Sequence, residues 1–128
     1  MIALLALMMV AGRPMVIVDE RAVRVREVPP HNGKGMSTAY RISDKAPART
    51  MEFRKRSLDK GASIGIHVLS HDEVYYVVSG LGVVTSDTEE KPLTPGMAAY
   101  LYTGAAVGIV QRGTEPLVLI ISYPVPAK

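Results

Sequence analysis

Two histidines and one glutamate lie close together in the middle of the 128-residue chain: His67, His71 and Glu73. Two imidazoles and one carboxylate can hold a metal ion and leave coordination positions open, a set that suits Fe(II), Mn(II), Ni(II) or Zn(II). The alternative needs no ion, because His71 would cap a turn in solvent while Glu73 accepts a hydrogen bond from His67. Glu73 and His67 are the candidate catalytic residues, since either can move a proton.

The elements that must position these side chains are short β-strands. No window has the i, i+3, i+4, i+7 apolar spacing of a helix, whereas β-rich runs alternate with turns such as Asp59-Lys60-Gly61 and Ser79-Gly80. We expect strands over residues 38–42, 50–56, 63–69, 74–78, 82–85, 97–102, 106–111 and 117–123. Regular short strands separated by turns predict an all-β sandwich or barrel.

The chain length predicts one compact domain with its own core. We expect residues 38–128 to form the barrel and residues 1–37 to form an N-terminal segment. That segment has an apolar run over residues 1–12, a strand near residues 15–18 and a Pro/Gly-rich loop over residues 29–35. The chain has no cysteine, which excludes disulfides and thiolate metal sites.

Alternation along the strands indicates which side chains share the interior with Glu73. Side chains two positions apart in a strand point to the same face. If Glu73 points inward, Tyr75 does so too, and if Val107 points inward, so does Gln111. A mostly apolar interior with a few polar groups is the usual makeup of a small-molecule site. We expect a pocket for a small organic ligand, lined by His67, Leu69, Glu73, Tyr75, Tyr100, Tyr102, Val107 and Gln111.

The spacing of these residues resembles the two motifs of the cupin superfamily. The stretch from Gly61 to Gly80 places His67 and Glu73 at the spacing of the first motif, and the stretch from Gly96 to Gln111 is similar to the second. The segment between the motifs is short, as in small single-domain bacterial cupins. The resemblance implies a double-stranded β-helix, or jelly-roll, barrel with an N-terminal extension.

The resemblance also implies a metal site, but this chain lacks half of its ligands. Cupin metal ions are held by three histidines and one glutamate, and His67 and Glu73 match two of these positions. Leu69 and Val107 stand where two imidazoles belong, and neither side chain has a lone pair to donate. The usual cage is therefore not available, and His71 is the residue that could complete a reduced set with His67 and Glu73.

Several strands are apolar on both faces. Ile64, Ile66 and Val68 share one parity in their strand, and residues 117–121 have no polar member. A sheet covered on both sides needs a second layer, from the N-terminal segment or from a partner chain. We therefore expect a homodimer in which these side chains lie beneath a cover.

Basic residues alternate with apolar ones in the first half of the chain, as in Arg54, Lys55 and Arg56 after Phe53. This pattern indicates the solvated face or guarded edge of a strand. Because no aromatic platform for base stacking accompanies the charge, we expect no nucleic-acid partner.

Residues 1–12 are too short to span a bilayer, which needs about 20 apolar residues. We expect a cytoplasmic protein, with a periplasmic or secreted location as the alternative if this run is part of a signal segment. His31, in the Pro/Gly-rich loop, is expected to be solvated. The alternative is that the loop folds over the barrel mouth and brings His31 to the site.

Two functions remain open for the barrel. In the first, the protein is an enzyme of the oxygenase, isomerase or cyclase type, like the small cupins it resembles. In the second, it is a non-catalytic module that binds or senses a small molecule without a metal. Fold alone does not decide between them.

Overall fold

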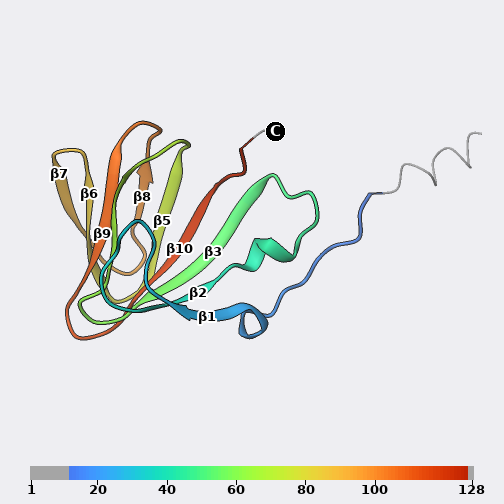
Figure 1. The fold of residues 1–128 in the computed structure, drawn as a ribbon, viewed down its shortest axis with the longest axis horizontal. Coiled ribbons are helices and arrows are strands. Elements are labelled where there is room, and N and C mark those ends of the chain that lie inside the picture. The colour runs from blue at the N-terminus through green and yellow to red at the C-terminus, as the bar shows by residue number, and fades with distance from the viewer. Residues whose placement is uncertain (1–11, 127–128) are drawn as a thin grey trace, which may run out of the picture.

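The protein folds into two antiparallel β-sheets packed face to face (Figure 1). The computed structural model describes residues 12–126. One sheet has six strands in the order β1-β2-β3-β10-β5-β8, and the other has four strands in the order β4-β9-β6-β7. The core fills the space between the sheets, and the expected all-β jelly-roll architecture is confirmed.

The described residues contain the following elements: η1 (Glu20–Val23), β1 (Arg24–Glu27), β2 (Ser37–Tyr40), η2 (Ile42–Lys45), β3 (Met51–Leu58), β4 (Ser63–Val68), β5 (Glu73–Ser79), β6 (Leu81–Ser86), β7 (Glu89–Leu93), β8 (Ala98–Leu101), β9 (Ala106–Arg112) and β10 (Leu117–Pro124). The eight strands expected between residues 38 and 123 are all present, with ends that differ by at most two residues.

Two strands were not expected, and one expected strand is absent. β1 is an edge strand of the six-stranded sheet, and β7 is an edge strand of the four-stranded sheet. Pro92 in β7 has no N–H group, and an edge strand tolerates this loss because one of its sides has no neighbouring strand. Residues 15–18 do not form the expected strand. The side chains of Met15, Val16 and Ile17 are exposed to solvent.

Alternation within β5, β9 and β10 places one parity of each strand in the core. Tyr75, Ile109 and Leu119 are almost completely buried. Tyr76, of the opposite parity in β5, is half-exposed on the outer face of the six-stranded sheet. The period-2 pattern was therefore a sound guide to the interior in these three strands.

A bulge in β4 reverses the parity that was expected there. Ile64 pairs with Ile109 and His67 pairs with Val107, so that two residues of β4, Gly65 and Ile66, oppose one residue of β9. Such a bulge shifts the alternation by one position. Ile64 is buried, but Ile66 and Val68 are 59% and 69% exposed, contrary to the prediction that all three share one face.

The homodimer remains a prediction, because the structure contains one chain. Exposed Ile66 and Val68 on the outer face of the smaller sheet are compatible with a covering partner. Residues 1–11, which include most of the apolar run, lie outside the described part of the chain. Within residues 12–126, no helix has the length and apolar character needed to cross a membrane.

Residues 29–35, which we call the strap, cross the bulge of β4. The Gly65 amide donates to the Pro30 carbonyl at 3.2 Å, and Lys34 and Ser63 exchange backbone hydrogen bonds at 3.2 and 3.0 Å. The strap lies so close that a Cβ atom on Gly65 would fall 1.8 Å from the His31 carbonyl oxygen. Glycine at position 65 is therefore a condition for this crossing.

Replacing Gly65 by alanine is expected to lift the strap off β4. We expect Gly65→Ala to lower the free energy of unfolding by about 1–3 kcal/mol. The added Cβ would clash with the backbone of the strap, so either the strap or β4 would have to move. Urea denaturation measures this change. Val68→Ala, on the exposed face of the same strand, is the control, and a Gly65→Ala protein as stable as this control would show that the strap is not held against the bulge.

Candidate functional site

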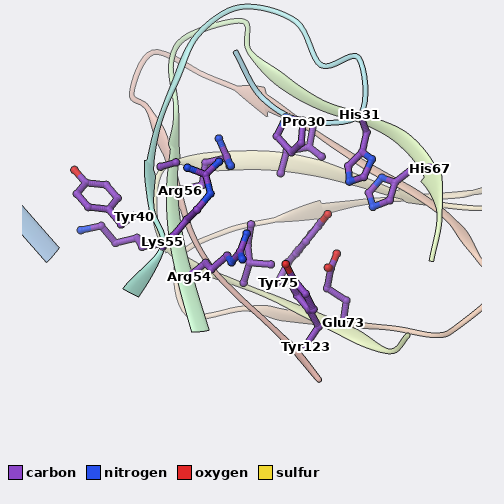
Figure 2. A pocket seen from close by; sticks show the side chains of 14 residues that line it. Pro30, His31, Tyr40, Arg54, Lys55, Arg56, His67, Glu73, Tyr75 and Tyr123 are labelled. Atoms are coloured by element: carbon purple, nitrogen blue, oxygen red, sulfur yellow. The ribbon is translucent and has the colours of Figure 1, made fainter. Parts of the chain in front are cut away.

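A small pocket of about 70 Å³, partly open to solvent, lies where the strap meets the larger sheet. Figure 2 shows His31, His67 and Glu73 on one side of it and Arg54 and Arg56 on the other, with Tyr75 and Tyr123 below. These side chains come from the strap and from strands β3, β4, β5 and β10. The pocket lining is thus polar and titratable on both sides.

His31 stacks on His67 at the mouth of the pocket. The two ring centroids are 3.4 Å apart and the rings are 6° from parallel. His31 also has a φ of 61°, which is uncommon for a residue other than glycine and clusters at functional sites. Burial lowers the pKa of His31, and the charges of His67 and Arg56 add to the effect. The loop thus brings His31 to the site, and the side chain stays exposed to solvent, as expected.

The His67 ring is held in one tautomer by the bulge. Its Nδ1 atom lies 3.0 Å from the Gly65 carbonyl oxygen. Because a carbonyl oxygen only accepts, Nδ1 must carry the proton, and the neutral ring then has Nε2 as its acceptor. His67 is therefore able to take a proton at Nε2.

Glu73 is a buried carboxyl in the pocket, 6% exposed at the start of β5. Burial raises its pKa above the usual value, although the Tyr75 hydroxyl, which donates to it, and the nearby His71 and His67 act in the opposite direction. Among residues 12–126 no lysine or arginine forms an ion pair with it. A carboxyl without a cationic partner can exchange a proton with a ligand.

An arginine network lies on the opposite side, where its members Arg54 and Arg56 line the pocket. Ion pairs of 2.6–3.5 Å join four arginines and three carboxylates: Arg41, Arg49, Arg54 and Arg56 with Glu27, Asp44 and Glu52. Burial alone would raise the pKa of Glu52, but hydrogen bonds from Arg49 and Ser43 outweigh it and lower the pKa to about 2. The arginines beside Glu27 and Glu52 thus lower the pKa of both carboxyls.

The arginines of β3 were predicted to mark a wet face or an edge, and this was wrong. β3 lies between β2 and β10, and Arg56 is only 6% exposed. The alternation of Glu52, Arg54, Arg56 and Leu58 on one parity was the signal that could have placed them inside. Tyr123, which also lines the pocket, shares its strand parity with buried Leu119 and Ile121, so the same pattern could have identified it.

Three of the eight residues expected to line the pocket do so: His67, Glu73 and Tyr75. Leu69 and Val107 are buried in the hydrophobic core instead. Gln111 is buried too, but its amide oxygen accepts from the Gly61 amide at 2.8 Å and its amide nitrogen donates to three carbonyls of the turn that follows β9. Gln111 therefore secures backbone and has no part in the pocket.

Tyr100 and Tyr102 lie outside the pocket, contrary to expectation. Leu101 is the buried residue of β8, so Tyr100 points outward, and Tyr102 follows the end of the strand. They are 56% and 68% exposed. The Tyr100 hydroxyl donates to Asp72 at 2.6 Å, which gives it a role in holding the turn before β5.

The donor groups do not fit a cupin-type metal cage. Among the described residues, no three His, Cys, Asp or Glu side chains gather closely enough to hold an ion. His71 is stacked on Tyr123 at a centroid distance of 4.4 Å, and its Nδ1 lies 3.1 Å from the Asp72 carbonyl oxygen. His31 does not replace it, because a metal binds in the plane of an imidazole and the parallel planes of His31 and His67 share no point. Metal binding by His67, His71 and Glu73 stays a prediction without support from this arrangement.

Comparison with protein-family models matches residues 55–123 to the cupin domain, which is more than half of the chain. The chain belongs to the cupin superfamily. The match begins in β3 and ends in β10, so it contains His67, Glu73 and Tyr75 but not the strap with His31. A search of curated proteins finds no significant match.

Solved cupin structures have the same fold at low sequence identity. A predicted oxalate decarboxylase from Thermotoga maritima has a TM-score of 0.76 at 20% identity and covers 87% of this chain and 100% of its own. A sugar phosphate isomerase from Silicibacter pomeroyi has a TM-score of 0.68 at 18% identity, with 88% and 76% covered. An RmlC-like cupin from Shewanella frigidimarina has a TM-score of 0.61 at 26% identity, with 72% and 78% covered.

Restoring the two missing imidazoles is expected to create a metal site. Leu69 and Val107 are buried, and Val107 pairs directly with His67. We expect Leu69→His with Val107→His to bind Ni(II) or Zn(II) at least tenfold more tightly than the wild-type cupin, because four donors then share one interior region. Isothermal titration calorimetry on protein without a polyhistidine tag measures the affinity.

Adding His67→Ala to the double variant is the control and should abolish the gain. Burying two polar rings can itself destabilise the cupin by several kcal/mol, so folding is checked first by circular dichroism. Unchanged metal binding in a folded double variant would show that positions 69 and 107 do not correspond to cupin ligand positions.

The raised pKa of Glu73 predicts a pH-dependent cost to stability. In the unfolded protein the Glu73 carboxyl loses its proton above its usual pKa of 4.5, whereas the folded protein keeps the proton up to a higher pH. The free energy of unfolding of the wild type therefore falls as the pH rises from 4.5 to the raised pKa of the folded protein. Glu73→Gln has no such titration and keeps a polar partner for Tyr75. We expect Glu73→Gln to be more stable than wild type at neutral pH, with the difference shrinking as pH falls towards 4.5.

Urea denaturation at a series of pH values measures the difference between the two proteins. Glu89→Gln, an exposed carboxylate of β7, is the matched control and should show no comparable gain. A difference between Glu73→Gln and wild type that does not vary with pH would mean that burial does not disfavour the ionised form of Glu73.

Proposed function

We propose that this cupin binds a small organic molecule in the pocket and catalyses an isomerase-type proton transfer on it. The observation that carries the proposal is Glu73: a buried carboxyl with a raised pKa that lines the pocket and forms no ion pair with a lysine or arginine among the described residues. Perturbed carboxyls in clefts are typical of general acids and bases. Of the structural neighbours named above, one is described as an isomerase.

Glu73 and His67, which lie on the same side of the pocket, divide the work of proton transfer. Glu73 removes a proton from carbon, and its burial makes the ionised form a stronger base than a surface carboxylate. His67, with Nδ1 protonated, accepts or returns a proton at Nε2. The Tyr75 hydroxyl, whose pKa is raised well above its usual value by burial, stays protonated and donates a hydrogen bond.

The stacked His31 ring covers one face of His67 and limits the access of water to it. Shielding of this kind strengthens electrostatic interactions within a site and reduces proton exchange with solvent. The strap therefore completes the pocket from outside the barrel.

The second candidate is a cupin that binds or senses a small molecule without catalysis. The observation that favours it is the apolar pair Leu69 and Val107, buried where metal ligands stand in the superfamily. Under this alternative the pocket still binds a ligand, but no bond to hydrogen is broken.

Hydrogen exchange distinguishes the two candidates. Tag-free, EDTA-treated protein in D₂O is mixed with dihydroxyacetone phosphate, pyruvate, 2-oxobutanoate or oxaloacetate, and loss of the C–H signal next to the carbonyl is followed by NMR. We expect accelerated exchange for at least one compound, and a reduction of about 10²–10⁴-fold in Glu73→Gln.

Tyr76→Phe, on the outward parity of the same strand, is the control and should exchange like wild type. Calorimetric binding without exchange would favour the non-catalytic candidate. Exchange at the wild-type rate in Glu73→Gln would remove Glu73 from the mechanism.

A further inference from the structure

Arg56 has a free edge inside the protein. Its side chain is 8% exposed, and it donates to the Ser37 hydroxyl at 2.9 Å and to Glu27 at 3.5 Å. Both bonds leave from Nη1. The donors on Nε and Nη2 therefore have no hydrogen-bond partner in the protein within residues 12–126, and, because neither is a fully buried unpaired atom, they remain within reach of solvent or a ligand.

Arg54 repeats this arrangement two residues earlier on the same face of β3. Its bonds to Asp44, at 3.3 Å, and to Glu52, at 3.1 Å, both leave from Nη2. Its Nε is buried and is the one buried side-chain nitrogen or oxygen in the described chain that lacks a partner. Figure 2 shows both guanidinium groups on the side of the pocket away from His31, His67 and Glu73.

The charges of this wall do not balance. Within the arginine network, Arg41 and Arg56 share one carboxylate, Glu27, whereas Arg49 and Arg54 pair with two, Asp44 and Glu52. Glu73 takes no part in these ion pairs. One positive charge therefore remains at a largely buried wall, where an anion is attracted more strongly than it would be in water.

We propose that the Nε and Nη2 edge of Arg56 binds the carboxylate of a small organic acid, which is the substrate of the pocket. This inference rests on the proposed function and names its substrate class. The edge of a guanidinium presents two parallel N–H donors whose spacing matches the two oxygens of a carboxylate.

A single carboxylate suits the wall better than a phosphate ester. One excess positive charge balances a carboxylate monoanion, whereas a phosphate monoester is close to a dianion at neutral pH. With its carboxylate at Arg56, the acid extends past Tyr75 towards Glu73 and His67 on the opposite side of the pocket. The carbon that exchanges its proton is then the one remote from the carboxylate.

Binding is tested on the wild-type protein with matched pairs of probes. Pyruvate and methyl pyruvate differ by one negative charge, and inorganic phosphate and glycerol 3-phosphate test the other oxyanion. Calorimetry gives the affinities, and the Nε–H signal of Arg56 in ¹⁵N-resolved NMR reports whether the arginine edge is engaged. We expect pyruvate to bind at least tenfold more tightly than methyl pyruvate and both phosphates, and to shift the Arg56 signal.

Arg56→Lys keeps the charge and removes the paired donors. We expect it to weaken pyruvate binding at least tenfold, while Arg24→Lys, on the exposed strand β1, binds like wild type. If Arg56→Lys does not fold, the probe pairs and the Arg56 signal decide the question on the wild-type protein. Preference for either phosphate, or equal binding of pyruvate and methyl pyruvate, overturns the assignment, as does the absence of binding by all four probes.

The Glu73→Gln variant separates this inference from the proposed function. Pyruvate binding that persists in Glu73→Gln, together with no hydrogen exchange in the wild type, leaves the carboxylate site in place and removes the catalytic proposal. Exchange of methyl pyruvate, which carries no negative charge, without a shift of the Arg56 signal by pyruvate, keeps the catalytic proposal and removes the carboxylate site.

Discussion

The bulge in β4 is the constraint on which the site depends. Two residues of this strand, Gly65 and Ile66, face one residue of β9, and the resulting shift turns His67 towards the interior. The same bulge presents the Gly65 carbonyl to His67 Nδ1. It also places Gly65, which has no Cβ atom, at the point where the strap crosses. Tautomer, orientation and shielding of His67 therefore have one local cause, and a regular strand would provide none of them.

The pocket separates two kinds of uncompensated polar group. On one side Glu73 is buried without a cation, and on the other the arginine network has more guanidinium groups than carboxylates within the described chain. Pairing Glu73 directly with Arg56 would satisfy both, but the two stand on opposite sides of the pocket (Figure 2). Keeping them apart costs stability, and such costs are typical of sites that bind a ligand.

Period-2 alternation predicted the interior wherever a strand is regular. It placed Glu73 with Tyr75 in β5 and Val107 with Gln111 in β9, all of which are buried. It failed for Ile66 because a bulge depends on pairing with another strand, which the pattern of one strand does not contain. Arg56 was misplaced for a different reason: burial of a charged side chain depends on partners such as Glu27 and Ser37, which are distant in sequence.

The strap lies outside the cupin match, and this has an evolutionary consequence. Adding or deleting one residue between β1 and β2 would move His31 away from His67 while the hydrogen-bonded ladders of the barrel stayed intact. Under the proposed proton transfer, a change of loop length alone would therefore alter the surroundings of His67, at little risk to folding. Two cupins with nearly identical barrels need not share a chemistry, and the connection between β1 and β2 is the place to look for the divergence.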